Sequence, residues 1–65
     1  MKNRVRDLRV ARGWSQVELG ARAGVSRQAI IAIETGRFDP SLPLAFTLAR
    51  LFGLAIEDIF EWDGK

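Results

Sequence analysis

Apolar residues recur through most of the chain at spacings of three and four, which places them on one face of an α-helix. Val5 and Leu8 show this spacing near the start, and Leu44, Leu48 and Leu51 show it further along. The predicted helical segments are 3–12, 15–23, 26–36, 41–53 and about 56–61, where the third and fourth ranges include the glycine that ends the helix. No stretch alternates apolar and polar residues with a period of two, so we expect an all-α fold.

Serines and glycines mark the ends of these segments. Ser15 opens the sequence SQVE, a capping box in which the serine accepts a hydrogen bond from a first-turn amide and Glu18 reaches back. Ser26 and Ser41 hold the same cap position before the third and fourth segments. Glycines end the first four segments, and we expect the helices to stop there.

The connection between the second and third segments is unusually short. The sequence ARAGVSRQ leaves only Gly24 and Val25 between one helix end and the next cap. Gly24 can adopt the left-handed conformation that reverses the chain, and Val25 can fill the corner. Helices joined this tightly cross steeply, which predicts a helix-turn-helix over residues 15–36. The same turn also occurs in purely structural helical domains.

The third segment, VSRQAIIAIETG, has apolar residues on two sides. A helical wheel gathers Ser26, Ala29, Ile30 and Ile33 on the side that we expect to face the core. The other side collects Gln28, Ile31, Ala32 and Thr35, with Arg27 at its edge. No acidic residue lies on this outer side.

The outer side of this segment fits the major groove of DNA. Arginine pairs with guanine and glutamine with adenine through two hydrogen bonds each, which makes Arg27 and Gln28 candidate base-reading residues. Ile31 and Ala32 would then contact thymine methyl groups. Another helix or a dimer partner covering Ile31 and Ala32 explains the same pattern.

Composition limits the remaining possibilities. The 65 residues form one domain, and a chain of this size buries only about 60% of its unfolded surface. Cysteine and histidine are both absent, so there is no disulfide and we expect no metal site. No apolar run approaches the roughly 20 residues that span a bilayer. We expect a cytoplasmic protein without a cofactor, a small-molecule ligand or a membrane partner.

The charges divide unevenly along the chain. Residues 1–37 carry eight lysines and arginines against three acidic residues, a net charge of +5, whereas residues 38–65 have a net charge of −3. A basic half favours a polyanionic partner on one side of the molecule. Solvated surface charge on a small protein is the alternative interpretation.

The motifs SQVEL, AGVSRQ, IETGR and DPSL together carry a family resemblance. From about Arg4 to Phe60 the chain resembles the helix-turn-helix of the Cro/C1 (XRE-type) regulators of bacteria, archaea and phages. It is most similar to a compact subfamily that consists of little more than this domain. The resemblance implies a five-helix, lambda-repressor-like, DNA-binding domain.

The resemblance also implies roles for individual residues. Arg27, Gln28, Ile31 and Ala32 match positions that face base edges, and Gln16, Ser26, Thr35 and Arg37 match phosphate contacts. Arg9 and Glu34 match a partly buried ion pair that joins the first helix to the end of the third. The sequence departs from the family at Gly20, where alanine is usual, and at Ala55, where a serine or threonine would cap the last helix.

These observations favour a sequence-specific, homodimeric transcriptional regulator, and we expect a repressor. A single unit reads too few base pairs, whereas a twofold dimer places two recognition helices about 34 Å apart. The dimer surface is expected in the C-terminal part, at Phe46, Leu54, Ile56, Ile59, Phe60 and Trp62. For Trp62, packing under the last helix is the alternative.

Two other classes of function were compared with this one. An antitoxin-like or adaptor module, whose outer apolar face binds a protein, is supported by Ile31, Ala32 and the C-terminal aromatic residues. An enzyme is not expected, because histidine, cysteine and tyrosine are absent and the carboxylates are scattered. We find no combination of nucleophile, base and oxyanion donors in the sequence.

Overall fold

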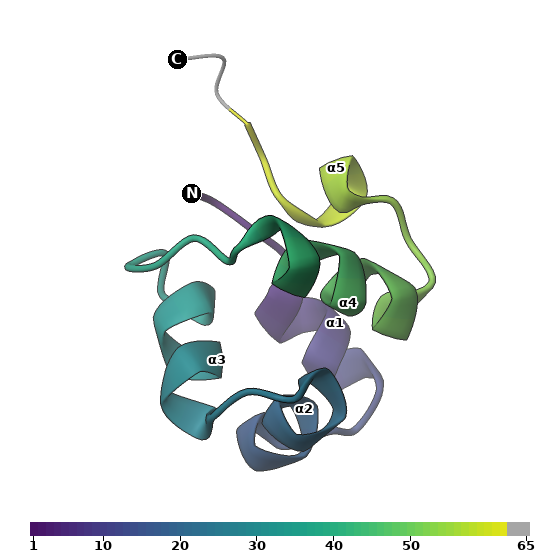
Figure 1. Cartoon of the computed structure of the whole chain (residues 1–65). Helices are drawn as coiled ribbons and strands as arrows, with labels where there is room; N and C mark the ends of the chain where they lie inside the picture. The colour runs from purple at the N-terminus through teal and green to yellow at the C-terminus, as the bar shows by residue number, and fades with distance from the viewer. Residues whose placement is uncertain (63–65) are drawn as a thin grey trace.

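The computed structural model describes residues 1–62, and this part of the chain contains five helices and no β-strand (Figure 1). The helices are α1 (Val5–Ala11), α2 (Gln16–Ala23), α3 (Arg27–Glu34), α4 (Leu42–Phe52) and α5 (Ile56–Ile59). The all-α prediction is confirmed. The first and last helices are shorter than the predicted segments 3–12 and 56–61, because the residues beside them pair with each other instead.

Serine side chains begin the three longest helices, as predicted. Ser15 accepts a hydrogen bond from the Glu18 amide at 3.0 Å, and Ser26 accepts one from Ala29 at 3.2 Å. Ser41 does the same for α4. The other half of the predicted capping box is not formed, because the Glu18 carboxylate pairs with Arg22 one turn later, at 3.1 Å.

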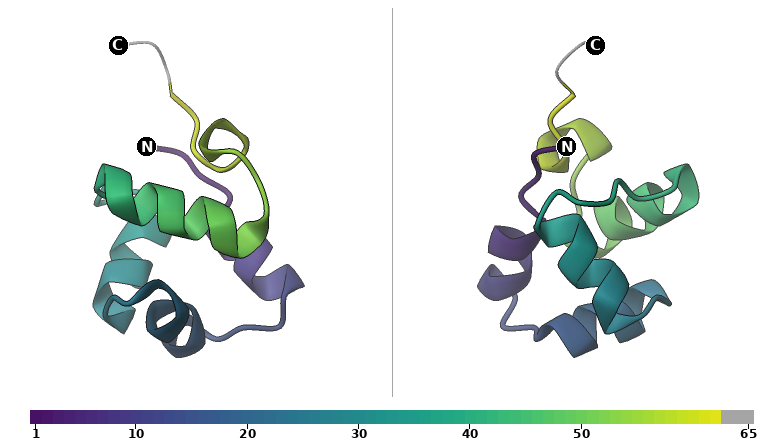
Figure 2. Two further views of the ribbon diagram at one scale, coloured as in Figure 1. Left: turned by 45° about the vertical axis from the view of Figure 1, so that its right-hand side comes forward. Right: turned by 90° about the vertical axis from the view of Figure 1, so that its left-hand side faces the viewer.

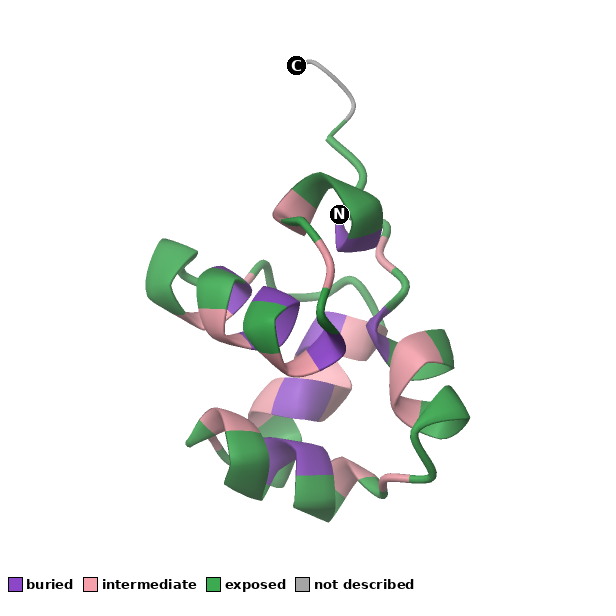
Figure 3. Ribbon diagram, turned by 90° about the vertical axis from the view of Figure 1, so that its right-hand side faces the viewer, coloured by how far each residue is buried: buried purple, intermediate pink, exposed green. Residues whose placement is uncertain are grey.

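The helices enclose one apolar core, to which every helix contributes (Figure 3). The buried residues are Val5, Leu19, Ile30, Ile33, Ala45, Leu48, Ala49, Phe52, Ile59 and Phe60. Ile30 and Ile33 lie on the side of α3 that the helical wheel assigned to the core. Since α3 anchors itself through these two side chains, its opposite side is left facing outward.

The turn between α2 and α3 has the predicted geometry. Gly24 adopts the left-handed conformation, with φ of 76°, and Val25 packs against the core. Gly20 allows the turn to pass close to α2, because a Cβ atom at this position would lie 2.8 Å from the Val25 carbonyl oxygen. The departure from the family at Gly20 therefore accompanies a close approach of the turn and the Ser26 cap to α2.

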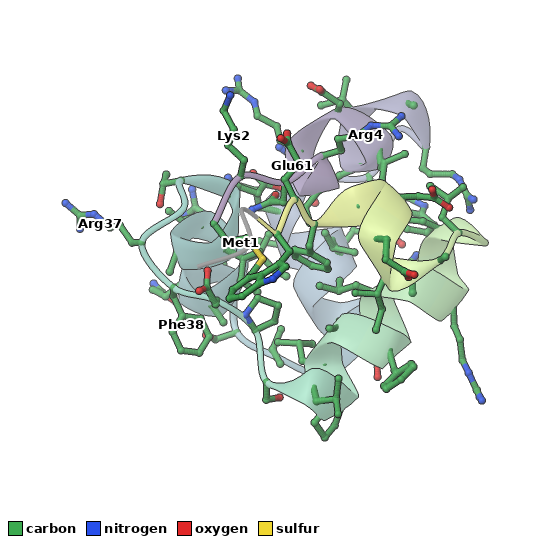
Figure 4. All side chains as sticks on the ribbon, turned by 90° about the horizontal axis from the view of Figure 1, so that it is seen from above. Met1, Lys2, Arg4, Arg37, Phe38 and Glu61 are labelled. Atoms are coloured by element: carbon green, nitrogen blue, oxygen red, sulfur yellow. The ribbon has the colours of Figure 1, made fainter. Side chains whose placement is uncertain are left out.

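The two ends of the described chain pair with each other (Figure 4). Asn3 and Phe60 form an isolated antiparallel bridge. The Arg4 amide donates to the Ile59 carbonyl at 2.9 Å, and the Glu61 amide donates to the Lys2 carbonyl at 2.8 Å. This pairing ends α5 after one turn and holds the residues before α1 in an extended path.

Arg12 joins the end of α1 to the end of α4. Its guanidinium donates to the carbonyl oxygens of Leu51 and Phe52 at 3.1 and 3.0 Å. These carbonyls belong to the last turn of α4, where helical partners are missing and a cation is favoured. The guanidinium also lies over the rings of Trp14 and Phe52. None of the helices within residues 1–62 is long and apolar enough to cross a membrane.

Candidate nucleic-acid interface

The outer side of α3 lies on the surface of the molecule (Figure 2, right). In that view no other helix crosses in front of it. Arg27 and Gln28 occupy its first turn, are exposed, and make no side-chain hydrogen bond or ion pair to residues 1–62. Both side chains are therefore available for pairing with an external partner.

Ile31 and Ala32 follow on the same helix and are half-buried. They are more covered by the protomer itself than the helical wheel suggests, but each keeps part of its surface accessible. The accessible surface of α3 is consequently polar and positive at its N-terminal end and more apolar further along. A major groove presents both kinds of feature, since base edges offer hydrogen-bonding atoms and thymine offers a methyl group.

The position of α3 is fixed by an ion pair with α1. The Arg9 Nε atom lies 2.7 Å from a Glu34 carboxylate oxygen, and the side chains are only 12% and 4% exposed. Arg9 also donates to the Trp14 carbonyl at 2.9 Å. A buried charge without a partner is costly, so the pair favours one arrangement of the two helices. The ion pair expected from the family resemblance is confirmed.

Gln16 completes this network from α2. Its Nε2 atom donates to Glu34 Oε1 at 3.2 Å. Because a side-chain amide carries two donor hydrogens, one remains for an external acceptor. One carboxylate thus joins the start of α2 and the end of α3 to α1, and Gln16 helps to hold α3 in place.

Gln16 and Thr35 line the same hollow, although they belong to different segments. Arg6, Arg9, Ser15 and Glu34 complete its lining. The Thr35 hydroxyl lies 2.9 Å from the Ile31 carbonyl and 3.2 Å from the Ala32 carbonyl, within its own helix. The hydroxyl must rotate away from these oxygens before it can donate to a phosphate. The sequence pattern gives no sign of this competition.

Arg6 enters this hollow from α1, and the sequence pattern assigned it no role. The available signal was its position one helical turn before Arg9, on the same side of α1. That spacing places two guanidinium groups on one helix face. Only the fold shows that this face meets Gln16 and Thr35.

Ser26 and Arg37 lie at opposite ends of α3. The Ser26 oxygen caps the helix, while its hydroxyl hydrogen is free to donate outward. Arg37 is exposed in the loop after α3, and its side chain extends away from the ribbon (Figure 4). Both residues are placed at the surface, as phosphate contacts require.

A second, mostly apolar hollow lies between α4 and α5. It is lined by Phe46, Ala49, Arg50, Gly53, Leu54, Ala55, Ile56 and Glu57. Three residues expected at a dimer surface, Phe46, Leu54 and Ile56, therefore come together here. Phe46 is 54% exposed, and Trp62 on the terminal segment is 71% exposed.

Ile59 and Phe60 differ from this expectation. They are buried in the protomer core, with exposed fractions of 1% and 6%. The short α5 presents Ile59 inward, and the bridge to Asn3 turns Phe60 onto the core. Their apolar bulk stabilises the fold of one chain and offers little surface to a second chain.

The geometry of α2 and α3 agrees with comparisons to known proteins. The sequence profile described as helix-turn-helix matches residues 5–59. The chain belongs to the helix-turn-helix family. This family consists of DNA-binding transcriptional regulators and is not a class of enzymes.

Relatives match this helix-turn-helix protein over nearly their whole length. An uncharacterized HTH-type transcriptional regulator of Methanocaldococcus jannaschii is 51% identical over 63 residues, covering 97% of this chain and 96% of the relative. The uncharacterized HTH-type transcriptional regulator YgzD of Bacillus subtilis is 47% identical over 60 residues, covering 92% and 91%. The matched residues thus make up nearly the whole of each of these two regulators.

Solved structures show the same fold. The restriction-modification controller protein C.AhdI from Aeromonas hydrophila superposes with a TM-score of 0.78 at 32% identity, covering 88% of this chain and 86% of that protein. A hypothetical transcription factor, NHTF from Neisseria, superposes with a TM-score of 0.75 at 33% identity. The second match covers 83% of this chain and 61% of NHTF.

Proposed function

We propose that this helix-turn-helix protein binds a specific double-stranded DNA sequence in the major groove, as a homodimer, and represses transcription in the cytoplasm. The observation that carries the proposal is the first turn of α3. Arg27 and Gln28 are exposed there and unengaged within residues 1–62, on a helix held rigidly by the Arg9–Glu34 pair. An arginine and a glutamine on a fixed helix can each pair with a base edge through two hydrogen bonds.

The placement of four further residues supports a role for them in phosphate binding. Gln16, Ser26, Thr35 and Arg37 surround the exposed part of α3 and are proposed to hold phosphates. Phosphate contacts set the register of a protein on the duplex, while base contacts supply sequence preference. Ile31 and Ala32 are proposed to lie against thymine methyl groups.

A homodimer is supported by the hollow between α4 and α5. A 65-residue domain has limited core area, so covering an exposed apolar surface adds stability. Phe46, Leu54 and Ile56 are proposed to form the centre of the interface, with Trp62 beside it. Two copies related by a twofold axis would read two half-sites in one duplex.

Selection of bound duplexes from a random pool tests this proposal. The expected product is a palindromic motif whose half-sites are centred about 10 base pairs apart. Affinity for that duplex should fall steeply with salt, with a log–log slope of about −0.9 for each phosphate neutralised. Failure to enrich any motif, or binding that does not respond to salt, would contradict the proposal.

Repression is tested separately on the selected motif. When the motif is placed across a promoter, addition of the protein should lower transcription from that promoter in a purified system. Transcription that rises instead would replace repression with activation while leaving DNA recognition intact.

A protein-interaction module is the second candidate, and the exposure of Phe46 and Trp62 favours it. An antitoxin-like or adaptor domain would form a stable complex with another protein in the absence of DNA. Such a complex, together with a selection that enriches no duplex, would establish the second candidate over the first.

A further inference from the structure

We propose that Arg6 is a further phosphate-binding residue, which completes a subsite for one DNA phosphate together with Gln16 and Ser15. The inference rests on the proposed DNA binding and adds a contact to it. Arg6 lies on α1, outside the helix-turn-helix segment. The protein would therefore hold the DNA backbone with its first helix as well as with α2 and α3.

The lining of the hollow provides the geometry. Arg6 and Arg9 come from α1, Ser15 and Gln16 from the start of α2, and Glu34 and Thr35 from the end of α3. Residues from three helices or their caps thus meet around one opening. Two of these residues, Gln16 and Thr35, are proposed phosphate contacts on independent grounds.

The charge balance of the hollow favours an anion. Glu34 carries the negative charge in its lining, and that carboxylate is buried and already accepts hydrogen bonds from Arg9 and Gln16. Arg6 is exposed and makes no ion pair or side-chain hydrogen bond within residues 1–62. Once Arg9 and Glu34 offset each other, one positive charge remains, and it belongs to Arg6.

The unused hydrogen-bond donors match a phosphodiester oxygen. Gln16 has one amide hydrogen left after its bond to Glu34. Ser15 uses its oxygen to cap α2, so its hydroxyl hydrogen is free. Arg6 adds a guanidinium, whose paired N–H groups fit two oxygens of one phosphate. A phosphate in this position would neutralise the charge that the hollow leaves uncompensated.

The test compares Arg6→Gln with Arg4→Gln on the duplex recovered by selection. Both changes remove one positive charge near the start of α1, but the Arg4 guanidinium is directed toward the Asp58 carbonyl, at 3.1 Å. Arginine and glutamine have similar helix propensities, so Arg6→Gln should leave the fold intact. A thermal unfolding curve for each variant verifies this.

Arg6→Gln should weaken the affinity for the selected duplex and for unrelated duplexes alike, by about tenfold, because a charged hydrogen bond to the DNA backbone is lost. The salt slope should become shallower by about 0.9 for each protomer, as expected for one phosphate contact fewer. Arg4→Gln should change the affinity much less. Equal effects of the two substitutions would overturn the subsite, because they would show only the loss of general positive charge.

Neutral methylphosphonate groups, placed at one backbone position at a time, identify the phosphate itself. At one position in each half-site, neutralisation should weaken the wild-type protein about tenfold and weaken Arg6→Gln much less, because the variant has already lost its charged contact to that phosphate and keeps only those of Ser15 and Gln16. If the effect of Arg6→Gln and the effect of neutralisation multiply at every backbone position, no single phosphate is coupled to Arg6, and the assignment is overturned. If the wild-type protein selects no duplex at all, the proposed function fails as a whole, which is a different result from failure of Arg6 alone.

Inorganic phosphate provides the remaining comparison. A free anion lacks the adjoining backbone contacts, so titration of the protein with inorganic phosphate should give weak, millimolar binding at most. Tight binding of inorganic phosphate, with amide shifts confined to Ser15, Gln16 and Thr35, would identify a free anion as the ligand and overturn the assignment to DNA.

Discussion

At the scale of single residues, Arg27 is expected to determine part of the sequence preference. Arg27→Ala should weaken binding to the selected duplex by about 1–3 kcal/mol and relax the preference at one base pair, because a bidentate contact to guanine is lost. Binding assays on the selected duplex and on single-base variants measure this.

Arg37→Ala provides the matched comparison, since it also removes one exposed arginine. It should weaken all duplexes to a similar extent and reduce the salt slope by about 0.9 per protomer, as a phosphate contact does. If Arg27→Ala shows this uniform pattern instead, Arg27 binds phosphate and the base-reading assignment is wrong.

Residue type and helix face could be predicted from sequence, but only some of the hydrogen-bond partners could. The family resemblance gave the Arg9–Glu34 pair, which the structure confirms. Glu18 was expected to complete a capping box and instead pairs with Arg22, since both partners are within reach of an exposed glutamate. Arg6 received no role, because its significance depends on Gln16 and Thr35 lying beside α1 in space.

At the scale of helices, starts and stops followed local rules wherever the controlling residue lies within the segment. Ser26 begins α3 and Gly24 reverses the chain after α2, as predicted. The residue at which α1 begins and the residue at which α5 ends were predicted less well, because a bridge between Asn3 and Phe60 controls both. Pairing of residues so distant in sequence leaves no signal in the spacing of apolar residues.

Asn3 connects the start of α1 to the end of α3. Its Nδ2 atom donates to the Ile33 carbonyl at 2.8 Å, and its Oδ1 atom accepts a hydrogen bond from the Val5 amide at 3.1 Å. The Ile33 carbonyl lies in the last turn of α3 and also accepts a hydrogen bond from the Gly36 amide, at 3.1 Å. One side chain therefore serves two helix ends.

Asn3→Asp is expected to separate these two contacts. The aspartate keeps an acceptor for Val5 but loses the donor to Ile33, so the free energy of unfolding should fall by about 1–2 kcal/mol. Denaturation with urea measures the change. Asn3→Ala removes both contacts and should be more destabilising than Asn3→Asp. An Asn3→Asp variant as stable as the wild type would show that the bond to α3 adds nothing.

At the scale of the whole molecule, the positive charge and the exposed apolar surface lie on different helices. The basic residues of the first 37 positions lie mainly around α1, α2 and α3, whereas the apolar hollow lies between α4 and α5. The excess of apolar residues in the C-terminal part could be predicted from the sequence. Which of these residues are buried in the core and which stay on the surface could not. Ile59 and Phe60 complete the core, and Phe46 remains exposed, because only the fold sets which side of each short helix faces inward.

Phe46→Gln is expected to weaken self-association. Phe46 is exposed at the hollow that we propose as the dimer interface, and aromatic side chains often dominate the binding energy of such surfaces. The substitution should raise the dimer dissociation constant at least tenfold, measured by analytical ultracentrifugation. DNA binding should then require higher protein concentration, because two half-sites are no longer bound by a preformed pair.

Val10→Gln provides the control for loss of exposed apolar surface. Val10 is 60% exposed on α1 and lies outside the hollow between α4 and α5, so this substitution should leave the dissociation constant unchanged. The melting temperature adds a second measure, since a dimer becomes more stable as its concentration rises, and Phe46→Gln should reduce that dependence. A wild-type protein that remains monomeric at all concentrations and on its selected duplex would refute the dimer, because each chain would then have to recognise its site alone.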